Sequence, residues 1–357
     1  MAIPRIARAP HTSKVPDVCP HCGGRALTRR GTRKKKFEIV QLWRCASCKR
    51  MFTPAPAALR NKTYPLRVIL DAITTYSLGY SHEETRRRMK AKSGRAISDS
   101  TLSAWLAEHD SLLSYRRLRD AGRRRFPPEQ TVRSVKLYHR QVYRYAFHRP
   151  KLELLRESEE HQRFAPLANF LEAIPLICPH ALFRTEDAGG RASQAQPQFA
   201  DVTRIIVNRK ENAATRAAAL VIPTVGDNRR QHDRLQQFML ANDSVTFAVE
   251  VPIWLKEDDI AALEKKHGVE LAQRDKNAGR VITGHLDFLQ VRNGAVHILD
   301  YKPDARTNKP IAQLAIYALA LTRLVPGLKL FDIKCAWFNE EEYCEFFPRT
   351  LFAVKRG

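Results

Sequence analysis

The stretch Val281–Leu321 reads VITGHLDFLQVRNGAVHILDYKPDARTNKPIAQLAIYALAL and contains the strongest fold signal in the chain. Asn293-Gly294 is typical of a two-residue hairpin turn, because both residues tolerate the positive backbone angles that such a turn needs. Apolar, β-branched and aromatic residues dominate on both sides of it, which predicts a β-hairpin. In the two-residue register the numbers of facing residues sum to 587, so Asp287 is expected to face Asp300 at roughly 5 Å.

Two facing carboxylates repel each other and would destabilise the sheet unless a divalent cation lies between them. Lys302 follows Asp300 by two residues and therefore lies on the same face of its strand. Residues 311–321 are predicted to form a helix on which Gln313 and Tyr317, four residues apart, share one face. An isolated Asp-x-Lys would also fit an ordinary strand end with solvated charges, and the ordered set argues against that interpretation.

The succession G-x-x-D, a strand ending in D-Y-K, and Q-x-x-x-Y on a helix resembles the PD-(D/E)xK nuclease superfamily, most closely its RecB-type nuclease domains. The resemblance implies an α/β restriction-endonuclease-like fold for the C-terminal domain. It also implies that Asp287 and Asp300 bind catalytic Mg²⁺ or Mn²⁺, and that Lys302 acts on the attacking water or the phosphate. Gln313 and Tyr317 would then support the substrate and the site.

The family pattern has two further members, a Glu at the end of an earlier strand and a His on a preceding helix. Glu250 in VTFAVEVPIW matches the first, and a site role is favoured because an unpaired carboxylate is costly to bury in so apolar a strand. His232 matches the second loosely, since the family's Gly-x-x-x-His spacing is not reproduced. It shares a helical face with Leu235 and Met239, so a core histidine fits as well as a magnesium ligand.

The charge of the chain points to a polyanionic partner. Its 357 residues carry a formal net charge of +24, with a pI near 10.1. DNA fits this charge better than a membrane does, because no run of about 18 apolar residues is present. The N-terminus has no apolar segment typical of a secretory signal, so a cytoplasmic protein is expected.

Four of the seven cysteines form two C-x-x-C pairs, Cys19 with Cys22 and Cys45 with Cys48. This spacing predicts a structural Zn²⁺ site with four thiolate ligands, within a zinc ribbon over residues 15–53. The ribbon resembles those at the front of insertion-sequence transposases. Its dense positive charge, interleaved with aromatic residues, predicts phosphate contacts rather than a merely solvated face. The expected DNA-binding residues of the ribbon are Arg29, Arg30, Arg33, Lys34, Lys35 and Lys36.

Residues 60–125 are predicted to form a helix-turn-helix DNA-binding domain. Helices are expected over 65–78, from Ser81 to Met89 behind a capping box, and over 101–109 behind a Ser98 or Ser100 cap. The pattern is similar to the helix-turn-helix of transposases and recombinases, although generic helical bundles can imitate it. In that motif the last helix enters the major groove by its first residues, here Ser100, Thr101 and Ser103.

The remaining chain is divided into a mostly helical connecting region, 126–199, and the nuclease domain, 200–357. A strand near 132–145 is an alternative within the connecting region. The nuclease domain is expected to run in the order helix 212–221, helix 229–240, strand 245–254, hairpin, helix, and a last strand pair over 330–347.

These patterns together predict a Mg²⁺- or Mn²⁺-dependent deoxyribonuclease that is targeted to DNA by its zinc ribbon and helix-turn-helix, with a link to a mobile element or genome defence. The alternative is a DNA-binding or transposition accessory protein. Its nuclease-like domain would be inactive alone, or active only with a recombinase or ATPase partner.

Overall fold

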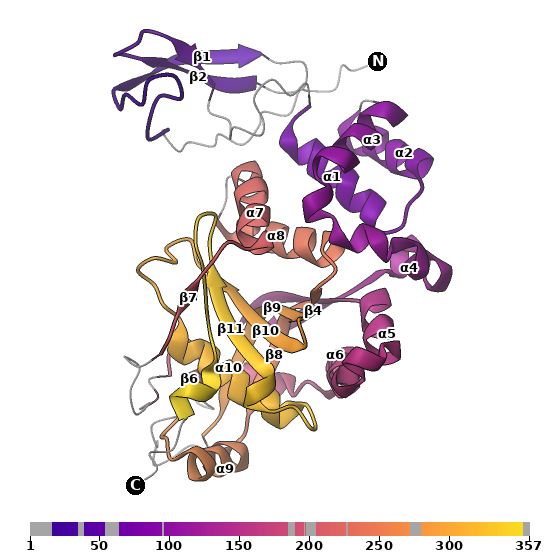
Figure 1. Cartoon of the computed structure of the whole chain (residues 1–357), viewed down its shortest axis with the longest axis vertical. Coiled ribbons are helices and arrows are strands. Elements are labelled where there is room, and N and C mark those ends of the chain that lie inside the picture. Colours follow the sequence, from indigo (N-terminus) through magenta and orange to yellow (C-terminus); the bar gives the residue numbers. More distant parts are fainter. Residues whose placement is uncertain are drawn as a thin grey trace. The chain divides into compact units, whose positions relative to one another are not determined.

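The computed structural model describes residues 16–34, 39–53, 64–94, 96–184, 190–195, 197, 205–225, 228–271 and 280–352 (Figure 1). The fold is mixed α/β, with one large sheet and surrounding helices. The chain divides into two compact units. The first comprises 1–76, 81–108 and 218–238, and the second comprises 77–80, 109–217 and 239–357. These boundaries differ from the expected ones, because residues 109–217 and 239–357 belong to one unit.

The N-terminal ribbon is a small antiparallel sheet of three strands, β1 (Leu27–Lys34), β2 (Ile39–Cys45) and β3 (Met51–Phe52). Its core consists of Cys19, Trp43, Cys45 and Phe52. So few apolar side chains give little hydrophobic stabilisation, which is the usual situation of a domain that a metal holds together. The expected ribbon is therefore found at the expected place.

Three helices follow, α1 (Leu66–Ser77), α2 (His82–Ser93) and α3 (Asp99–Glu108). Ser81 caps α2 by accepting a hydrogen bond from the Glu84 backbone N–H at 3.1 Å, as the sequence predicts. Ser98 likewise accepts from the backbone N–H of Thr101, so Ser98, and not Ser100, caps α3. The helix, turn and helix of the expected motif are thus present.

The second unit is built on a nine-stranded sheet. Eight strands follow one another in the order β4 (Val132–His139), β5 (Gln141–His148), β8 (Thr246–Leu255), β9 (Ile282–Arg292), β10 (Ala295–Tyr301), β11 (Ile333–Phe338), β12 (Tyr343–Phe346) and β7 (Asn208–Arg209). The ninth, β6 (Gly190–Arg191), pairs with β9. Pairing along the order is antiparallel except between β10 and β11.

The predicted hairpin is confirmed in position and register. Ala295 faces Arg292, and Leu299 faces Phe288, so the facing numbers sum to 587. Asn293 and Gly294 both have positive φ, at 51° and 65°, as a two-residue turn of this kind requires.

Residues 126–199, expected to be a mostly helical connection, contribute β4 and β5 to the main sheet. Leu137, Tyr145 and Phe147 are buried there in the same core as the C-terminal strands. The strand alternative is therefore correct, because the aromatic and apolar residues of β4 and β5 pack in the core of the main sheet. The two true helices of the segment are α5 (Arg149–Glu157) and α6 (Ala165–Ile177).

Helix α10 (Ile311–Leu324) packs on β8, β10 and β11. Every residue from Leu314 to Leu321 is buried, and a helix that is apolar on all sides belongs inside a protein. The other helices are α4 (Arg119–Arg125), α7 (Ala213–Val221), α8 (Asn228–Asn242) and α9 (Glu257–His267). The expected helices and strands of the nuclease segment thus occur close to their predicted bounds.

A buried lysine fixes the end of α8 beside the start of β8. Lys151 Nζ donates to the carbonyl oxygens of Leu240 at 2.7 Å and Thr246 at 2.9 Å. Replacing Lys151 by Met should lower the free energy of unfolding by about 2 kcal/mol or more, because two buried carbonyls lose their donor. Urea unfolding measures this. The exposed Lys136→Met serves as control, and equal unfolding midpoints for the two variants would contradict the assignment.

Candidate active site

Three carboxylates lie in a row across adjacent strands, Glu250 on β8, Asp287 on β9 and Asp300 on β10. The pairs Val249 with Phe288 and Val251 with Leu286 bracket Glu250 and Asp287, which therefore face each other. Across the hairpin, Leu299 pairs with Phe288. In the same register the next two residues, Asp300 and Asp287, face each other. Directly facing residues on neighbouring strands have Cβ atoms about 5 Å apart, so the row is compact.

The two aspartates of the row contact each other, and each has a further partner. Asp287 Oδ2 accepts the backbone N–H of Tyr301 at 3.0 Å. Asp300 is only 4% exposed, and its Oδ2 is buried. The close partner of that oxygen is the ammonium group of Lys302, whose Nζ lies 2.9 Å away as an ion pair. A buried carboxylate oxygen in this state has bonding capacity left for a ligand.

The ionisation of the row reflects burial and mutual repulsion. Burial, and then the charge of Asp287, raise the pKa of Asp300 to about 8. Burial also raises the pKa of Asp287, although the Lys302 charge opposes it. For Lys302, burial is the largest single effect and lowers the pKa, but the charge and hydrogen bond of Asp300 together with the charges of Asp287 and Asp304 outweigh it and raise the pKa above its ordinary value. Lys302 is therefore a cation, and the two aspartates compete for its charge.

Helix α10 supplies the predicted polar pair beside the row. Gln313 Nε2 donates to Tyr317 Oη at 2.8 Å. A Cβ at Gly284 would come within 2.5 Å of Tyr317 Cε1, so only glycine lets the ring lie this close to β9. Burial, and then the negative charge of Asp300, raise the pKa of Tyr317, which keeps its hydroxyl proton. The glycine of the G-x-x-D pattern thus has a steric reason.

Glu250 has an unusual backbone conformation. Its φ is +51°, whereas the other non-glycine residues with positive φ in the described chain are Lys49, Arg140 and Asn293. Arg140 and Asn293 lie at hairpin turns and Lys49 in a cysteine loop, but Glu250 is in the middle of β8. A bulky residue held in this conformation is strained, and such strain concentrates at functional sites.

His232 is not placed in the row by the structure. It lies on α8, in the segment 218–238 that belongs to the first compact unit. It is half-buried, one turn before the buried Leu235 and two turns before the buried Met239. The core interpretation and the magnesium-ligand hypothesis both stay open for this residue.

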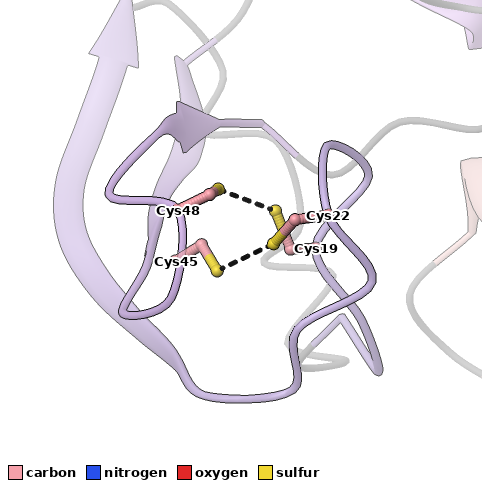
Figure 2. Close-up of side chains that lie close together, drawn as sticks. All are labelled: Cys19, Cys22, Cys45 and Cys48. Atoms are coloured by element: carbon pink, nitrogen blue, oxygen red, sulfur yellow. Dashed lines mark hydrogen bonds between the residues drawn. The ribbon is translucent and has the colours of Figure 1, made fainter.

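Within the described residues, two groups of side chains bring three or more metal-ligand atoms within 4.8 Å of one another. The first is the predicted group of Cys19, Cys22, Cys45 and Cys48 (Figure 2). Its Sγ atoms are 3.7 Å apart for Cys19 and Cys48 and 3.6 Å apart for Cys22 and Cys45. Thiolates at 2.3 Å from a tetrahedral zinc lie roughly 3.8 Å apart, so the group could bind a structural zinc.

The second group, His139, Cys178 and His180, was not predicted. Cys178 and His180 are two residues apart, but His139 is about forty residues away, so the group follows no recognised spacing. The three carboxylates of the acidic row are not such a group, so their oxygens would have to converge further to share one ion. Their donor type still suits Mg²⁺, which prefers one or two carboxylates together with water and substrate oxygens.

The predicted DNA-binding residues are only partly described. Arg29, Arg30 and Arg33 are exposed on β1, and the Arg29 guanidinium lies 5.4 Å from the centre of the Trp43 ring. Lys34 ends β1, and Lys35 and Lys36 lie outside the described residues. On α3, Ser100 and Ser103 are exposed, while Thr101 is half-buried with its hydroxyl 2.7 Å from that of Ser98. No helix within the described ranges combines the length and apolarity that crossing a membrane requires.

Replacing Asp300 by Asn should stabilise the metal-free protein, since an amide carries no charge to bury beside Asp287. The folded pKa of Asp300 lies above its unfolded value, so the wild type loses stability as the pH rises from about 4 to about 8. The variant lacks this loss. Its advantage in unfolding free energy should therefore grow toward pH 8, reaching on the order of 1–3 kcal/mol.

Chemical unfolding in EDTA at pH 5 and pH 8 measures the difference between wild type and Asp300→Asn. The exposed Asp304→Asn removes the same charge from a solvated site and should change stability little at either pH. An Asp300→Asn variant that is less stable than the wild type at pH 8 would show that the carboxylate is not under strain.

No protein-family model, curated protein or solved structure matches the chain. The functional argument therefore rests on the geometry of its own residues.

Proposed function

We propose that the protein is a Mg²⁺- or Mn²⁺-dependent DNA nuclease of the PD-(D/E)xK type, with a restriction-endonuclease-like C-terminal domain. The observation that carries the proposal is the row of Glu250, Asp287 and Asp300 on three adjacent strands, with Lys302 beside its last member. Burying like charges side by side is unfavourable, so an arrangement of this kind implies a positively charged ligand.

The residues of the row fit a hard divalent cation. All three offer carboxylate oxygens, and Asp300 Oδ2 is buried with the Lys302 ammonium as its close partner. Asp287 and Asp300 would hold the ion, with Glu250 as the further ligand. A cation bound there would lower the pKa of a water molecule and offset the negative charge that develops during phosphodiester hydrolysis.

The other side chains have roles that follow from their protonation. Lys302 is charged, so it would stabilise the phosphate oxygens or hold the attacking water rather than remove a proton. Tyr317 keeps its proton and accepts a hydrogen bond from Gln313, so its own O–H remains a donor toward the carboxylates or the substrate. Gln313 would hold the tyrosine in that orientation.

DNA is the polyanion we favour as substrate. The net charge of +24 suits a partner with a phosphate backbone, and exposed arginines line one strand of the ribbon. The ribbon and the α2–α3 motif would bring the substrate to the carboxylates. The similarity of both modules to those of transposases supports a role linked to a mobile element or genome defence.

Cleavage of supercoiled and linear DNA by the purified chain with Mg²⁺ or Mn²⁺ tests the proposal. Asp300→Ala should reduce the rate by at least about 10³-fold, because it removes a metal ligand, and EDTA should abolish cleavage. Asp304→Ala, an exposed carboxylate four residues further on, should retain wild-type activity.

The outcomes separate the candidate functions. Nicking of supercoiled DNA indicates an endonuclease, and degradation of linear DNA alone indicates an exonuclease. Tight DNA binding without cleavage under either metal would reject an autonomous nuclease. It would instead support the accessory protein, whose cleavage depends on a recombinase or ATPase partner.

The ribbon arginines should contribute to DNA affinity through the phosphate backbone. Replacing Arg29, Arg30 and Arg33 by Ala should weaken binding at all sequences. It should also reduce the slope of log K against log salt concentration by up to about 3 units. Fluorescence anisotropy over a salt series measures both. The control is a second triple variant, in which Ala replaces the exposed Lys265, Lys266 and Lys329 of the second unit and removes the same charge. An equal change in the two triple variants would indicate that net charge alone controls binding.

A further inference from the structure

Three ligand-type side chains meet in the second compact unit, apart from the acidic row. His139 is the last residue of β4, Cys178 directly follows α6, and His180 begins a short 3₁₀ helix, His180–Phe183. His139 Nε2 lies 2.8 Å from His180 Nδ1 and 3.9 Å from Cys178 Sγ. One ligand atom from each of the three residues thus lies within 4.8 Å of the other two.

The geometry is close to that of a zinc site. Zinc binds imidazole nitrogen at about 2.0–2.1 Å and thiolate sulfur at about 2.3 Å, so tetrahedral ligands would be roughly 3.3 Å apart for two nitrogens and 3.6 Å for nitrogen and sulfur. Both observed distances come within about half an ångström of these values. His139 and Cys178 are buried and His180 is half-buried, so the set is anchored in the core and reaches the surface at one side.

A fourth side chain fixes the orientation of the central imidazole. His139 Nδ1 lies 2.9 Å from His285 Nε2, and His285 stacks on Tyr143 with the ring centres 3.6 Å apart. In the tautomer in which His139 Nδ1 donates to His285 Nε2, the Nε2 lone pair of His139 is directed toward Cys178 and His180. Metal-bound histidines have such a partner on the other ring nitrogen, where it fixes the tautomer.

A plain hydrogen-bonded chain would explain these contacts as well, because the Cys178 thiol lies within hydrogen-bond distance of His139 Nε2. Cys178 adds a soft sulfur donor to two nitrogens, and this combination selects zinc over magnesium.

We propose that His139, Cys178 and His180 bind a second zinc ion, with the fourth position open toward solvent and His285 orienting His139. The site joins β4 to the segment after α6. Through His285 it also reaches β9, where Asp287 follows two residues later on the same face of the strand. The proposal is independent of nuclease activity, because it concerns the metal content of the folded chain.

Elemental analysis of the full-length purified chain tests this proposal. The wild type should contain two zinc ions per chain, one in the ribbon and one at the new site. Cys178→Ser and His180→Ala should each contain one. Cys344→Ser alters another buried cysteine, in β12, and should keep two, as should Asp300→Ala in the acidic row.

Cobalt substitution gives a second readout that does not depend on counting zinc. In a Cys22→Ser, Cys48→Ser background the ribbon is disabled, and added Co²⁺ should still produce a thiolate charge-transfer band, which Cys178→Ser removes. His180 is half-buried, so His180→Ala keeps the test valid if Cys178→Ser fails to fold. A wild type with one zinc, or zinc content and cobalt spectra unchanged in both variants, would overturn the proposal.

Discussion

The repulsion between Asp287 and Asp300 is the constraint on which the arrangement around the hairpin depends. The turn at Asn293 and Gly294 fixes the register, and the register leaves the two carboxylates no way to avoid each other. Lys302 compensates only part of this charge, since the pKa of Asp300 is still raised to about 8. Such a site is costly in the metal-free protein, and it persists because the surrounding sheet determines the backbone at both positions.

Helix α10 supports the strained backbone at the row. Helix α10 is buried over most of its length, so its position against β8, β10 and β11 is set by packing and not by the polar residues it carries. Gly284 then determines how closely Tyr317 approaches β9. A rigid helix and one missing Cβ therefore position the tyrosine hydroxyl, and Gln313 needs only to select its orientation.

Sequence patterns within a few residues predicted much of the fold and of the candidate site. Contacts between segments far apart in the sequence could not be predicted in this way. The hairpin register, the Ser81 cap and the cysteine pairs each depend on residues a few positions apart, where spacing alone determines geometry. The entry of β4 and β5 into the main sheet depends on a partner about a hundred residues away, and their aromatic residues fit a helix as well as a strand until β8 is present. The meeting of His139 with Cys178 and His180 was missed for the same reason, because His139 is about forty residues from the other two.

Strand β9 contributes a residue to each of the two proposed metal sites, and the two sites offer different donor atoms. His285 and Asp287 share one face because side chains alternate along a strand, but His285 contacts the nitrogen and sulfur donors while Asp287 lies in the row of oxygens. A soft ion is favoured by the first set and a hard ion by the second, so the donor atoms alone would direct zinc and magnesium to different places. An ion at the histidines would also hold β9 in position, and this would favour the alignment of Asp287 with Glu250 and Asp300.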